Sequence, residues 1–382
     1  MIYREIGKTG KKAGIIGLGC EHLDKKPYEQ VKKTIDAALE HEINMFDIFM
    51  PGKEVRENLF RAFGTRRKDV MIQGHICSTD IAQQYDISRD MPVVQRYFED
   101  LLRLSGGYID FGMLFFIDSE DDYKNVFETG IADYALKLKE KGDIAHIGFS
   151  SHNPFTAIKA VNTGIVEMMM FSINPAFDII AAQENVLTHL DNGLNAEIFG
   201  GIDPVRSQLY RLCEQKNIGI TVMKALGAGK LISSEHTPFC KPMSVAQCVH
   251  YSLSRPAAAS VLLGCKSPEE IIEALKYLEL DEAALDYTEI LSTAGKGLKG
   301  SCVYCNHCQP CPSFIDIAAV NKYLDIAVLD TGNIPPSVRS HYKSLEHRGD
   351  ECIMCAACEK RCPFDVPVME NMKKAERIFK NP

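Results

Sequence analysis

The sequence lacks any run of about 20 apolar residues, the length that a membrane-spanning helix requires. Its amino terminus, MIYREIGKTGKKAG, also lacks the apolar stretch of roughly 7–15 residues that marks a secretory signal peptide. Positive charge is not in excess, because 43 Lys and Arg residues stand against 51 Asp and Glu, for a net charge of −8. Such an acidic chain is a poor match for nucleic acid. We therefore expect a soluble, cytoplasmic protein with no membrane and no nucleic-acid partner.

A regular alternation of strand-like and helix-like segments fills the first three quarters of the chain. With 382 residues, the chain exceeds the size at which a single core stops growing, so two domains are expected. Short apolar runs alternate with longer amphipathic segments, as in β/α units around a parallel sheet. The predicted strands are 13–20, 43–48, 69–76, 108–116, 144–150, 166–172, 218–224 and 259–265. The predicted helices are 28–41, 55–63, 91–104, 122–141, 154–163, 204–216, 244–254 and 268–277.

Eight such units predict an α/β fold, a (β/α)8 TIM barrel over residues 1–292, with its active site on the loops after the strands' carboxyl ends. A doubly wound open sheet is the main alternative, but no G-x-G-x-x-G motif follows the first predicted strand. The segment 178–203 is an unusually long connection, which we interpret as a lid or an unstructured loop. The glycine-rich AGKGLKG at 294–300 predicts a linker, and hence a second domain over 293–382.

Cysteines define this second domain. Eight of the 14 cysteines lie within 302–362, and the other six are scattered singly along the barrel. In a chain without an export signal, such clustering indicates metal ligands before disulfides. The run CIMCAACEKRCP at 352–363 has the C-x2-C-x2-C-x3-C-P spacing of bacterial ferredoxins. The run CVYCNHCQPCP at 302–312 repeats it with one residue fewer before the last cysteine.

In two-cluster ferredoxins the fourth cysteine of a run ligates the other cluster. The spacing therefore predicts a small α-helical, ferredoxin-like domain with two [4Fe-4S] clusters, one held by Cys302, Cys305, Cys308 and Cys362, the other by Cys352, Cys355, Cys358 and Cys311. Zinc, which also binds four thiolates, is the alternative metal. Two neighbouring clusters favour an electron relay, with a purely structural cluster pair as the alternative.

With these motifs in view, the whole chain resembles the aldo/keto reductase superfamily, in its branch with a carboxyl-terminal ferredoxin-like domain. The resemblance rests on YREIGKTGKKAGIIGLG (3–19), INMFD (43–47), IGFSS (147–151), MKALGAGKL (223–231) and GCKSPEEI (264–271). It implies a barrel pocket that binds NADPH across the strand ends. It also implies an Asp-Tyr-Lys-His tetrad whose tyrosine protonates a carbonyl as hydride arrives.

Carried over residue by residue, that tetrad is largely replaced. Asp47 matches the aspartate, whereas the tyrosine position falls at Pro51, the lysine position at His75 and the histidine position at Phe115. The tyrosine that stacks under nicotinamide in such enzymes falls at Ile173. The resemblance therefore implies a site that departs from ordinary carbonyl reduction.

Other positions keep family features of a cofactor site. The resemblance implies carboxamide contacts for Ser150, Ser151 and Asn174, a pyrophosphate loop at Gly227 and Gly229, and a 2′-phosphate contact for Lys266 and Ser267. The glycine loop and the Ser-Pro-Glu sequence also have structural interpretations, as a turn and as a helix cap. NADP(H) or a flavin is thus the cofactor considered for the barrel.

The predicted strand ends present a further set of polar side chains, which could hold a metal or form an acid/base pair near neutral pH. These are Cys20, Glu21, His22, Asp47, His75, Cys77, Ser151 and His152. Alternate strand residues point to opposite faces, so only some of them face the pocket. A histidine in such a place is also often just a hydrogen-bonded polar residue.

The leading hypothesis is an iron–sulfur oxidoreductase. A small-molecule substrate or a cofactor reacts in the barrel pocket, and electrons pass through the two clusters to or from a ferredoxin-like partner. Asp47 and His75 handle protons, assisted by His152. Two alternatives stay open: a non-catalytic electron-transfer or scaffold subunit whose pocket is filled by apolar side chains such as Phe49 and Phe115, and an NADPH-dependent carbonyl reductase with a rearranged site.

Overall fold

The computed structural model describes residues 1–81, 84–179, 202–292, 300, 302, 304, 308–328, 331–332, 334–362 and 364–380. Three predicted features therefore lie wholly or mostly outside the described residues: most of the connection interpreted as a lid, the predicted linker except Gly300, and Cys305.

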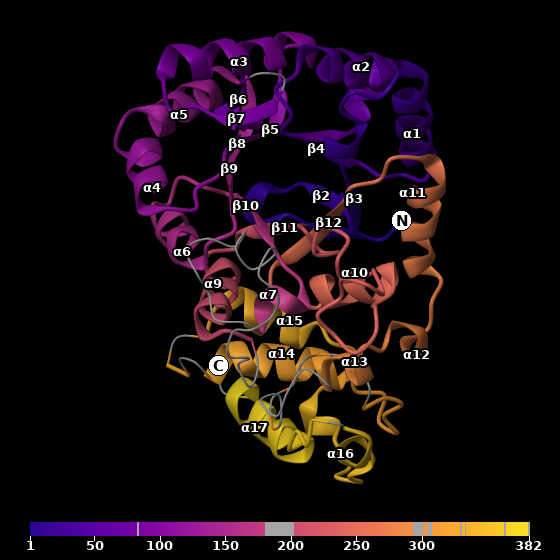
Figure 1. Cartoon of the computed structure of the whole chain (residues 1–382). Helices are drawn as coiled ribbons and strands as arrows, with labels where there is room; N and C mark the ends of the chain where they lie inside the picture. Colours follow the sequence, from indigo (N-terminus) through magenta and orange to yellow (C-terminus); the bar gives the residue numbers. More distant parts are fainter. Residues whose placement is uncertain are drawn as a thin grey trace.

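Eight parallel strands close into a barrel in the part of the chain before residue 292 (Figure 1). In order around the barrel they are β3 (Ile16–Gly19), β4 (Met45–Ile48), β5 (Met71–Ile76), β8 (Ile109–Leu114), β9 (Ile144–Ser151), β10 (Met168–Ser172), β11 (Gly219–Met223) and β12 (Ala258–Leu263). Strand β12 pairs with β3, with Val261 opposite Ile16, and so closes the ring. Each of the eight predicted strands overlaps one of these strands, which confirms the barrel prediction.

Amphipathic helices surround the barrel, and most follow the predicted segments. They are α1 (Tyr28–Glu40), α2 (Lys53–Phe63), α3 (Met91–Leu104), α4 (Glu120–Phe127), α5 (Ile131–Lys141), α6 (Pro154–Asn162), α7 (Pro175–Asp178), α9 (Pro204–Gln215), α10 (Val245–Leu253), α11 (Pro268–Leu275), α12 (Glu282–Leu285) and α13 (Thr288–Ser292). The prediction of one helix over 122–141 is wrong. Gly130 adopts a left-handed conformation with φ of 97°, which interrupts the helical path between α4 and α5.

Two antiparallel hairpins were not predicted, and they sit at opposite ends of the barrel. Strands β1 (Tyr3–Glu5) and β2 (Lys12–Gly14) form the first hairpin, which precedes β3 and joins the amino-terminal end of the barrel. Strands β6 (Ser78–Ile81) and β7 (Gln84–Ile87) form the second, directly after the carboxyl end of β5. The second hairpin therefore lies where a (β/α)8 barrel carries its active site.

The inside of the barrel changes from apolar to polar along its length. The apolar part is one buried cluster made of Ile6, Ala13, Met45, Met71, Phe111, Met113, Met168, Met170, Met223, Ala259 and Leu262. Above it, toward the carboxyl ends of the strands, the interior positions of β4 and β5 are Asp47, Gln73 and His75, all buried. Methionine and aromatic side chains fill the barrel toward the amino-terminal ends of the strands. A bound molecule can therefore react only at the carboxyl-terminal end.

The chain beyond the linker forms helices α14 (Ile317–Val328), α15 (Pro336–Lys343), α16 (Ala357–Arg361) and α17 (Val368–Lys380). Figure 1 shows them gathered beneath the barrel, beside α9 and α10. Helix α14 packs on α17, and the rings of Tyr342 and Phe379 stack with centroids 4.0 Å apart. His341 on α15 faces Glu214 on α9 across the junction, with 3.7 Å between Nδ1 and Oε2. Within the described part of the chain, no helix is long and apolar enough to cross a membrane.

Candidate active site

A histidine–aspartate pair occupies the polar end of the barrel. Asp47 on β4 lies opposite Gln73 on β5, and His75 is two residues further along the same strand face. His75 Nε2 lies 2.7 Å from Asp47 Oδ1, and Gln73 Nε2 lies 3.3 Å from the same oxygen. His75 is 1% exposed and Asp47 is 3% exposed. The structure thus brings together the two residues that the sequence assigned to proton handling.

One nitrogen of this pair has no partner among the described residues. His75 Nδ1 is buried without a hydrogen bond to any of them, whereas Nε2 is oriented by Asp47. A carboxylate on one ring nitrogen fixes the tautomer, and it leaves the other nitrogen to exchange a proton with a bound molecule.

Aromatic rings enclose the His75 imidazole. The Phe115 ring meets it edge-on at 5.0 Å between centroids, and the Phe49 ring lies at 6.1 Å. Phe49 and Phe115 stack at 5.8 Å, and Tyr85 of the β6–β7 hairpin meets Phe49 edge-on at 5.1 Å. The resemblance places the family's histidine at Phe115, and on that prediction an apolar wall would replace a proton donor there. Such a wall excludes water and strengthens the electrostatic contact between His75 and Asp47.

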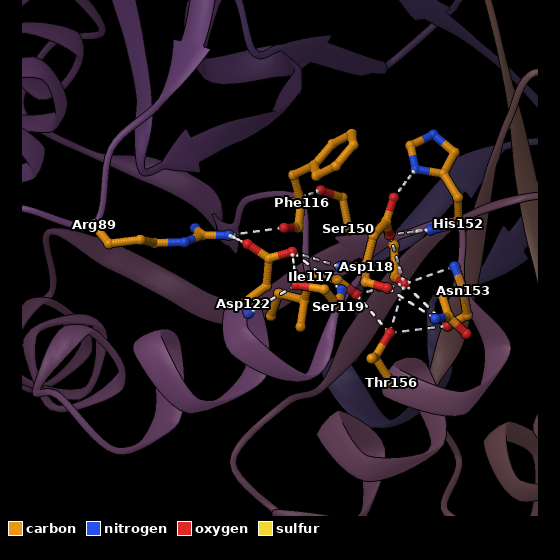
Figure 2. A network of polar contacts seen from close by, with 11 residues as sticks. Arg89, Phe116, Ile117, Asp118, Ser119, Asp122, Ser150, His152, Asn153 and Thr156 are labelled. Atoms are coloured by element: carbon orange, nitrogen blue, oxygen red, sulfur yellow. Dashed lines mark hydrogen bonds and ion pairs between the residues drawn. The ribbon is translucent and has the colours of Figure 1, made fainter. Parts of the chain in front are cut away.

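A second histidine–aspartate pair lies on the neighbouring edge of the barrel, as Figure 2 shows. Asp118 follows β8, and His152 follows β9. His152 Nδ1 lies 2.8 Å from Asp118 Oδ2, and the His152 backbone N–H donates to Oδ1 at 2.6 Å. Burial opposes ionisation of Asp118, yet the contacts with His152 and Ser151 hold the pKa of that carboxyl below its ordinary value. Like His75 Nδ1, His152 Nε2 is buried and has no hydrogen-bond partner in the part of the chain that the structure describes.

The loop that carries Asp118 is held from the other side. Arg89 donates to the Phe115 carbonyl oxygen at 2.9 Å. It also donates to the Phe116 carbonyl oxygen and to Asp122, both at 2.8 Å (Figure 2). The Phe116 N–H donates to the Ser150 hydroxyl at 2.9 Å. These contacts fix the loop before any ligand binds, which is the preorganisation that a reactive site needs.

Three residues just past strand ends adopt left-handed backbone conformations although none is glycine. They are Cys77 after β5, Phe116 after β8 and Lys224 after β11, with φ of 80°, 57° and 57°. Each such residue costs roughly 1–2 kcal/mol. Glu42, Asn217 and Ala257, which precede β4, β11 and β12, are also left-handed, so this conformation occurs at both ends of the barrel.

Lys224 and Asp118 are site residues that sequence reasoning missed. Burial lowers the pKa of Lys224, and the carboxylates of Glu21 and Asp118 oppose that effect. Its ammonium therefore belongs to the same mouth as the Asp118–His152 pair. Lys224 ends the predicted strand 218–224, and Asp118 lies two residues after the predicted strand 108–116, a placement that could have singled them out.

The three residues assigned to a nicotinamide carboxamide differ in their surroundings. Ser150 faces the loop at Phe116, as described above. The Ser151 hydroxyl is buried, 2.8 Å from the Ile117 carbonyl oxygen and 3.0 Å from Asp118 Oδ1. The Asn174 side chain donates to the Lys224 carbonyl oxygen at 2.9 Å and accepts from the Phe177 N–H at 2.9 Å. Asn174 thus caps α7, and Ser151 ties the end of β9 to the loop after β8, while their cofactor roles stay predictions.

The predicted phosphate positions also have local partners. Gly227 and Gly229 adopt φ of 57° and 85° within a tight turn, in which Gly227 N–H donates to the Lys224 carbonyl oxygen at 2.8 Å. The Lys266 ammonium lies 3.9 Å from Glu270, and Ser267 hydrogen-bonds Glu269. Two carboxylates beside this position oppose a bound 2′-phosphate through like-charge repulsion.

The remaining polar side chains of the strand ends do not converge. Cys20 and Cys77 are buried, and burial raises the pKa of both thiols. His22 packs against Gly264, where an added Cβ would meet its ring at 2.5 Å. Across the residues that the structure describes, no group of three His, Cys, Asp or Glu side chains is placed to hold a single metal ion.

Four cysteines from the two separate runs line one cavity beneath α17. They are Cys311 from the first run and Cys352, Cys355 and Cys358 from the second, the same four that the spacing grouped together. Ile315, Ile317, Val368 and Met372 complete an apolar wall, and Arg361 lies at its edge. The volume of this cavity is about 20 Å³. These four thiols form no disulfide.

The two cysteine runs also share a local conformation. Tyr304 and Met354 each stand two residues after the first cysteine of a run, and each is left-handed, with φ of 59°. Ala356, directly after Cys355, has φ of 60°. Left-handed residues turn consecutive backbone N–H groups to one side, which makes a concave anion-binding surface. Arg361 ties the runs together by donating to the carbonyl oxygens of Cys308 and Pro310 at 2.6 and 2.7 Å.

Of the first predicted cluster's ligands, Cys302, Cys308 and Cys362 are half-buried, and Cys305 lies outside the described residues. The neighbouring Tyr304 is 7% exposed and donates to Asp325 at 2.8 Å. Burial raises the pKa of Asp325 to about 6, although the hydrogen bond from Tyr304 acts to lower that pKa. The Arg255 guanidinium lies over the Tyr304 ring at 4.9 Å, and so joins the first run to the barrel wall.

The contact between Arg255 and Tyr304 lies at one end of a buried polar network in the barrel wall. Asp178 is 0% exposed and accepts from Tyr210 at 2.6 Å, from Arg206 Nε at 2.9 Å and from Tyr251 at 3.0 Å. The Arg255 guanidinium also lies over the Tyr251 ring, at 4.2 Å. The network therefore runs from α7 through α9 and α10 to the first cysteine run. The sequence reading missed it, because it placed Asp178 at the start of the long connection.

Residues 15–245 match the Aldo/keto reductase family. The structure is similar to a protein from Pseudomonas aeruginosa classed as an aldo-keto reductase, with a TM-score of 0.54, 17% identity, and coverage of 72% of this chain and 96% of that one. It is also similar to an aldo-keto reductase from Bacillus halodurans in its holo form, with a TM-score of 0.55, 16% identity, and coverage of 74% and 92%. No curated protein sequence matches the chain. At these identities the structural likeness shows the fold alone.

Proposed function

Because the chain belongs to the aldo/keto reductase family, whose members are oxidoreductases, we propose that it is an oxidoreductase that couples its barrel site to two [4Fe-4S] clusters. The observation that carries the proposal is the single cavity lined by Cys311, Cys352, Cys355 and Cys358. Thiolates from both runs surround it, as expected when the last cysteine of one run ligates the cluster of the other.

The residues around the cavity suit a cluster better than a single zinc ion. Four thiolates on one zinc lie about 2.3 Å from the metal and so nearly touch one another. No three potential ligands among the described residues converge that closely. The cavity is lined by apolar side chains and backed by the left-handed Met354 and Ala356, which suits a larger anionic group. When bound, the clusters would supply one-electron steps and a path to a ferredoxin-like partner.

In the barrel, the chain's own residues supply proton transfer. His75, oriented by Asp47, would give or take a proton at Nδ1, and His152, oriented by Asp118, would do so at Nε2. Lys224 would hold a negatively charged group of a small-molecule substrate at the same mouth. The aromatic wall of Phe49 and Phe115 would exclude water from the reacting atoms.

A nicotinamide or a flavin would accept or donate hydride in this pocket. The 2′-phosphate of NADP(H) is opposed by Glu269 and Glu270 beside Lys266 and Ser267. A flavin or a cofactor without that phosphate therefore suits the described residues better than NADP(H). The missing tyrosine at Pro51 sets the chain apart from carbonyl reductases of the usual kind.

A second candidate function is a non-catalytic electron-transfer or scaffold subunit. It is favoured by the stacked Phe49 and Phe115 rings, which lie over His75 at the position where a substrate would approach. In that case the barrel is a platform, and electrons enter the clusters from a partner protein alone.

The two functions are separated by an anaerobic titration of the purified, cluster-loaded protein. NADH, NADPH and reduced flavin are added in turn, and cluster reduction is followed by absorbance bleaching and EPR. Our proposal predicts that at least one of these donors reduces the clusters, and that His75→Ala slows this reduction without changing the EPR spectrum of dithionite-reduced protein. Clusters that respond only to dithionite or reduced ferredoxin, equally in wild type and His75→Ala, would refute the barrel site.

A further inference from the structure

A second cavity lies far from the barrel mouth, where α14 and α15 meet the amino-terminal end of the barrel. It has a volume of about 410 Å³ and is half open to solvent. The barrel contributes Arg4 of β1 and the chain around Asn217 and Ala257, which precede β11 and β12. The carboxyl-terminal helices contribute Lys322, Tyr323 and His341. Cavities that bind small molecules usually occupy about 300–1,000 Å³, so this one has the size of a ligand site.

Two cations line this cavity without an anionic partner. Arg4 uses one terminal nitrogen, NH1, to donate to the Leu253 and Ala258 carbonyl oxygens at 2.8 and 2.9 Å, and it makes no ion pair among the described residues. Lys322 makes neither a hydrogen bond nor an ion pair in the part of the chain that the structure describes. Its ammonium only lies 5.5 Å from the centre of the Tyr323 ring. Both side chains are half-buried, so water solvates them incompletely.

Two carboxylates line the barrel side of the cavity, and both are already engaged. Glu5 is exposed and lies 3.8 Å from the Lys12 ammonium. Glu214 Oε1 accepts from the Ala257 N–H at 2.6 Å, and Oε2 lies 3.7 Å from His341. It therefore neutralises neither Arg4 nor Lys322 by direct contact. Burial, helped by the nearby Arg4 and Arg255 and opposed by Glu214, lowers the pKa of Lys322 to about 8. Burial also lowers the pKa of Arg4. Two half-buried cations thus lie here without direct carboxylate contact among the described residues, and a bound anion would supply that contact.

We infer that this cavity binds a small molecule through an oxyanion group, a phosphate or a carboxylate, seated between the Arg4 guanidinium and the Lys322 ammonium. Arg4 keeps the rest of its guanidinium for a paired contact with two oxygens, the geometry at which arginine excels. The cavity is larger than a phosphate alone, so the ligand also carries an organic part. Ile218 and the Tyr323 ring offer apolar surface to that part.

The cavity lies at the junction of the two domains, away from the barrel mouth. Its walls come from both the barrel and the helices that follow the linker, so a ligand there contacts both domains at once. An oxyanion would bind more tightly when the two domains meet than when they are apart. Its binding would therefore favour the arrangement in which they meet. The cavity would thus let a metabolite stabilise the junction without touching the reactive site.

The test is calorimetric titration of the anaerobic, cluster-loaded full chain in low-salt buffer free of phosphate. Inorganic phosphate is the probe for a phosphoryl ligand, and succinate is the probe for a carboxylate ligand. We expect at least one probe to bind, and the tighter of the two identifies the class of ligand. We expect Lys322→Met to weaken that binding at least about tenfold, and Lys322→Arg to keep it within a few-fold.

Two controls keep the test decisive. Lys343→Met removes an exposed lysine of α15 outside the cavity, and binding should stay within twofold of wild type. Lys322→Met should melt no lower than wild type without ligand, because it removes a half-buried charge that has no partner. Absence of binding by both probes, or equal binding by wild type and Lys322→Met, would overturn the inference.

Discussion

The barrel is held together by strand pairing and by an apolar interior, whereas the chain from residue 308 onward has four short helices and no strand among its described residues. Barrel cysteines such as Cys20 and Cys213 are fully buried, but Cys355 is exposed and Cys352 is half-buried around an open cavity. Packing therefore explains the barrel without any cofactor. In the carboxyl-terminal region, packing leaves a thiol-lined space, and what binds there should decide how stable the region is.

The largest effect should come from a cysteine at that space. Cys355→Ala removes one predicted ligand of the second cluster, so the protein should lose about four of its roughly eight irons. Cys240→Ala, at an exposed cysteine of the barrel domain, should keep them all. Iron analysis of the two variants after anaerobic purification gives the comparison. Equal iron in both variants would mean that the cavity thiols do not bind a cluster.

A substitution in the barrel should slow cluster reduction and leave the iron content unchanged. His75→Ala removes the unpartnered Nδ1 that we assign to proton transfer, so donor-dependent cluster reduction should fall by about 10²–10⁴-fold, the usual contribution of an acid/base group. Iron content should stay at the wild-type level. His236→Ala, at an exposed histidine, should leave both quantities unchanged. The measurement is the rate of bleaching by the active donor, and an unchanged rate in His75→Ala would remove the proton-handling role.

The buried network at Asp178 tests whether the barrel is stable by itself. Asp178→Ala leaves the Arg206 guanidinium buried without its carboxylate, and two tyrosine hydroxyls lose their acceptor. Loss of one partner of a buried charge pair usually costs about 3–5 kcal/mol. Asp36→Ala, which breaks an exposed pair with Lys32, should cost less than about 1 kcal/mol.

Urea unfolding of the barrel, with and without bound iron, measures both variants. The account predicts that the Asp178→Ala loss is the same in iron-loaded and iron-free protein. A loss that appears only in the loaded form would show that barrel and cluster region are not separable.

The smallest effect concerns acid sensitivity at the barrel mouth. Asp118 has a lowered pKa in the folded chain, so it adds stability above its unfolded pKa of about 3.9, and that stability disappears as the pH falls through the lowered value. Asp118→Asn should lower stability at pH 7 by roughly 1–3 kcal/mol. It should also make unfolding less dependent on pH below about 4. Unfolding midpoints at pH 7, 4 and 3 provide the check, and parallel pH curves for both proteins would contradict it.

The barrel could be read from the sequence because each strand is an apolar run followed by an amphipathic segment, and repetition of that unit leaves few other folds. The reading failed where local signals were short. The β6–β7 hairpin, STDI to QYDI, has few apolar residues, and its place in the barrel mouth depends on Phe49 and Phe115 from other strands. The helix predicted across Gly130 failed because one glycine ended a helix that periodicity alone continued.

Some site residues could likewise be predicted from the sequence, and others could not. Asp47 and His75 could be paired in advance because they end neighbouring strands of a barrel. Asp118 was missed because its partner, His152, is 34 residues away and only the β8–β9 pairing brings them together. Cysteine spacing is a local signal, so the grouping of Cys311 with the second run could be stated from sequence. Lys322 and Arg4 could not be linked, because they are more than three hundred residues apart and meet only where the two domains do.

The most direct test of the central claim is iron and acid-labile sulfide analysis of the anaerobically purified full chain, combined with EPR of the dithionite-reduced protein. The account predicts about eight irons and eight sulfides per chain, and a spectrum broadened by interaction between two neighbouring [4Fe-4S] clusters. About four irons or fewer, or stoichiometric zinc without sulfide, would contradict it.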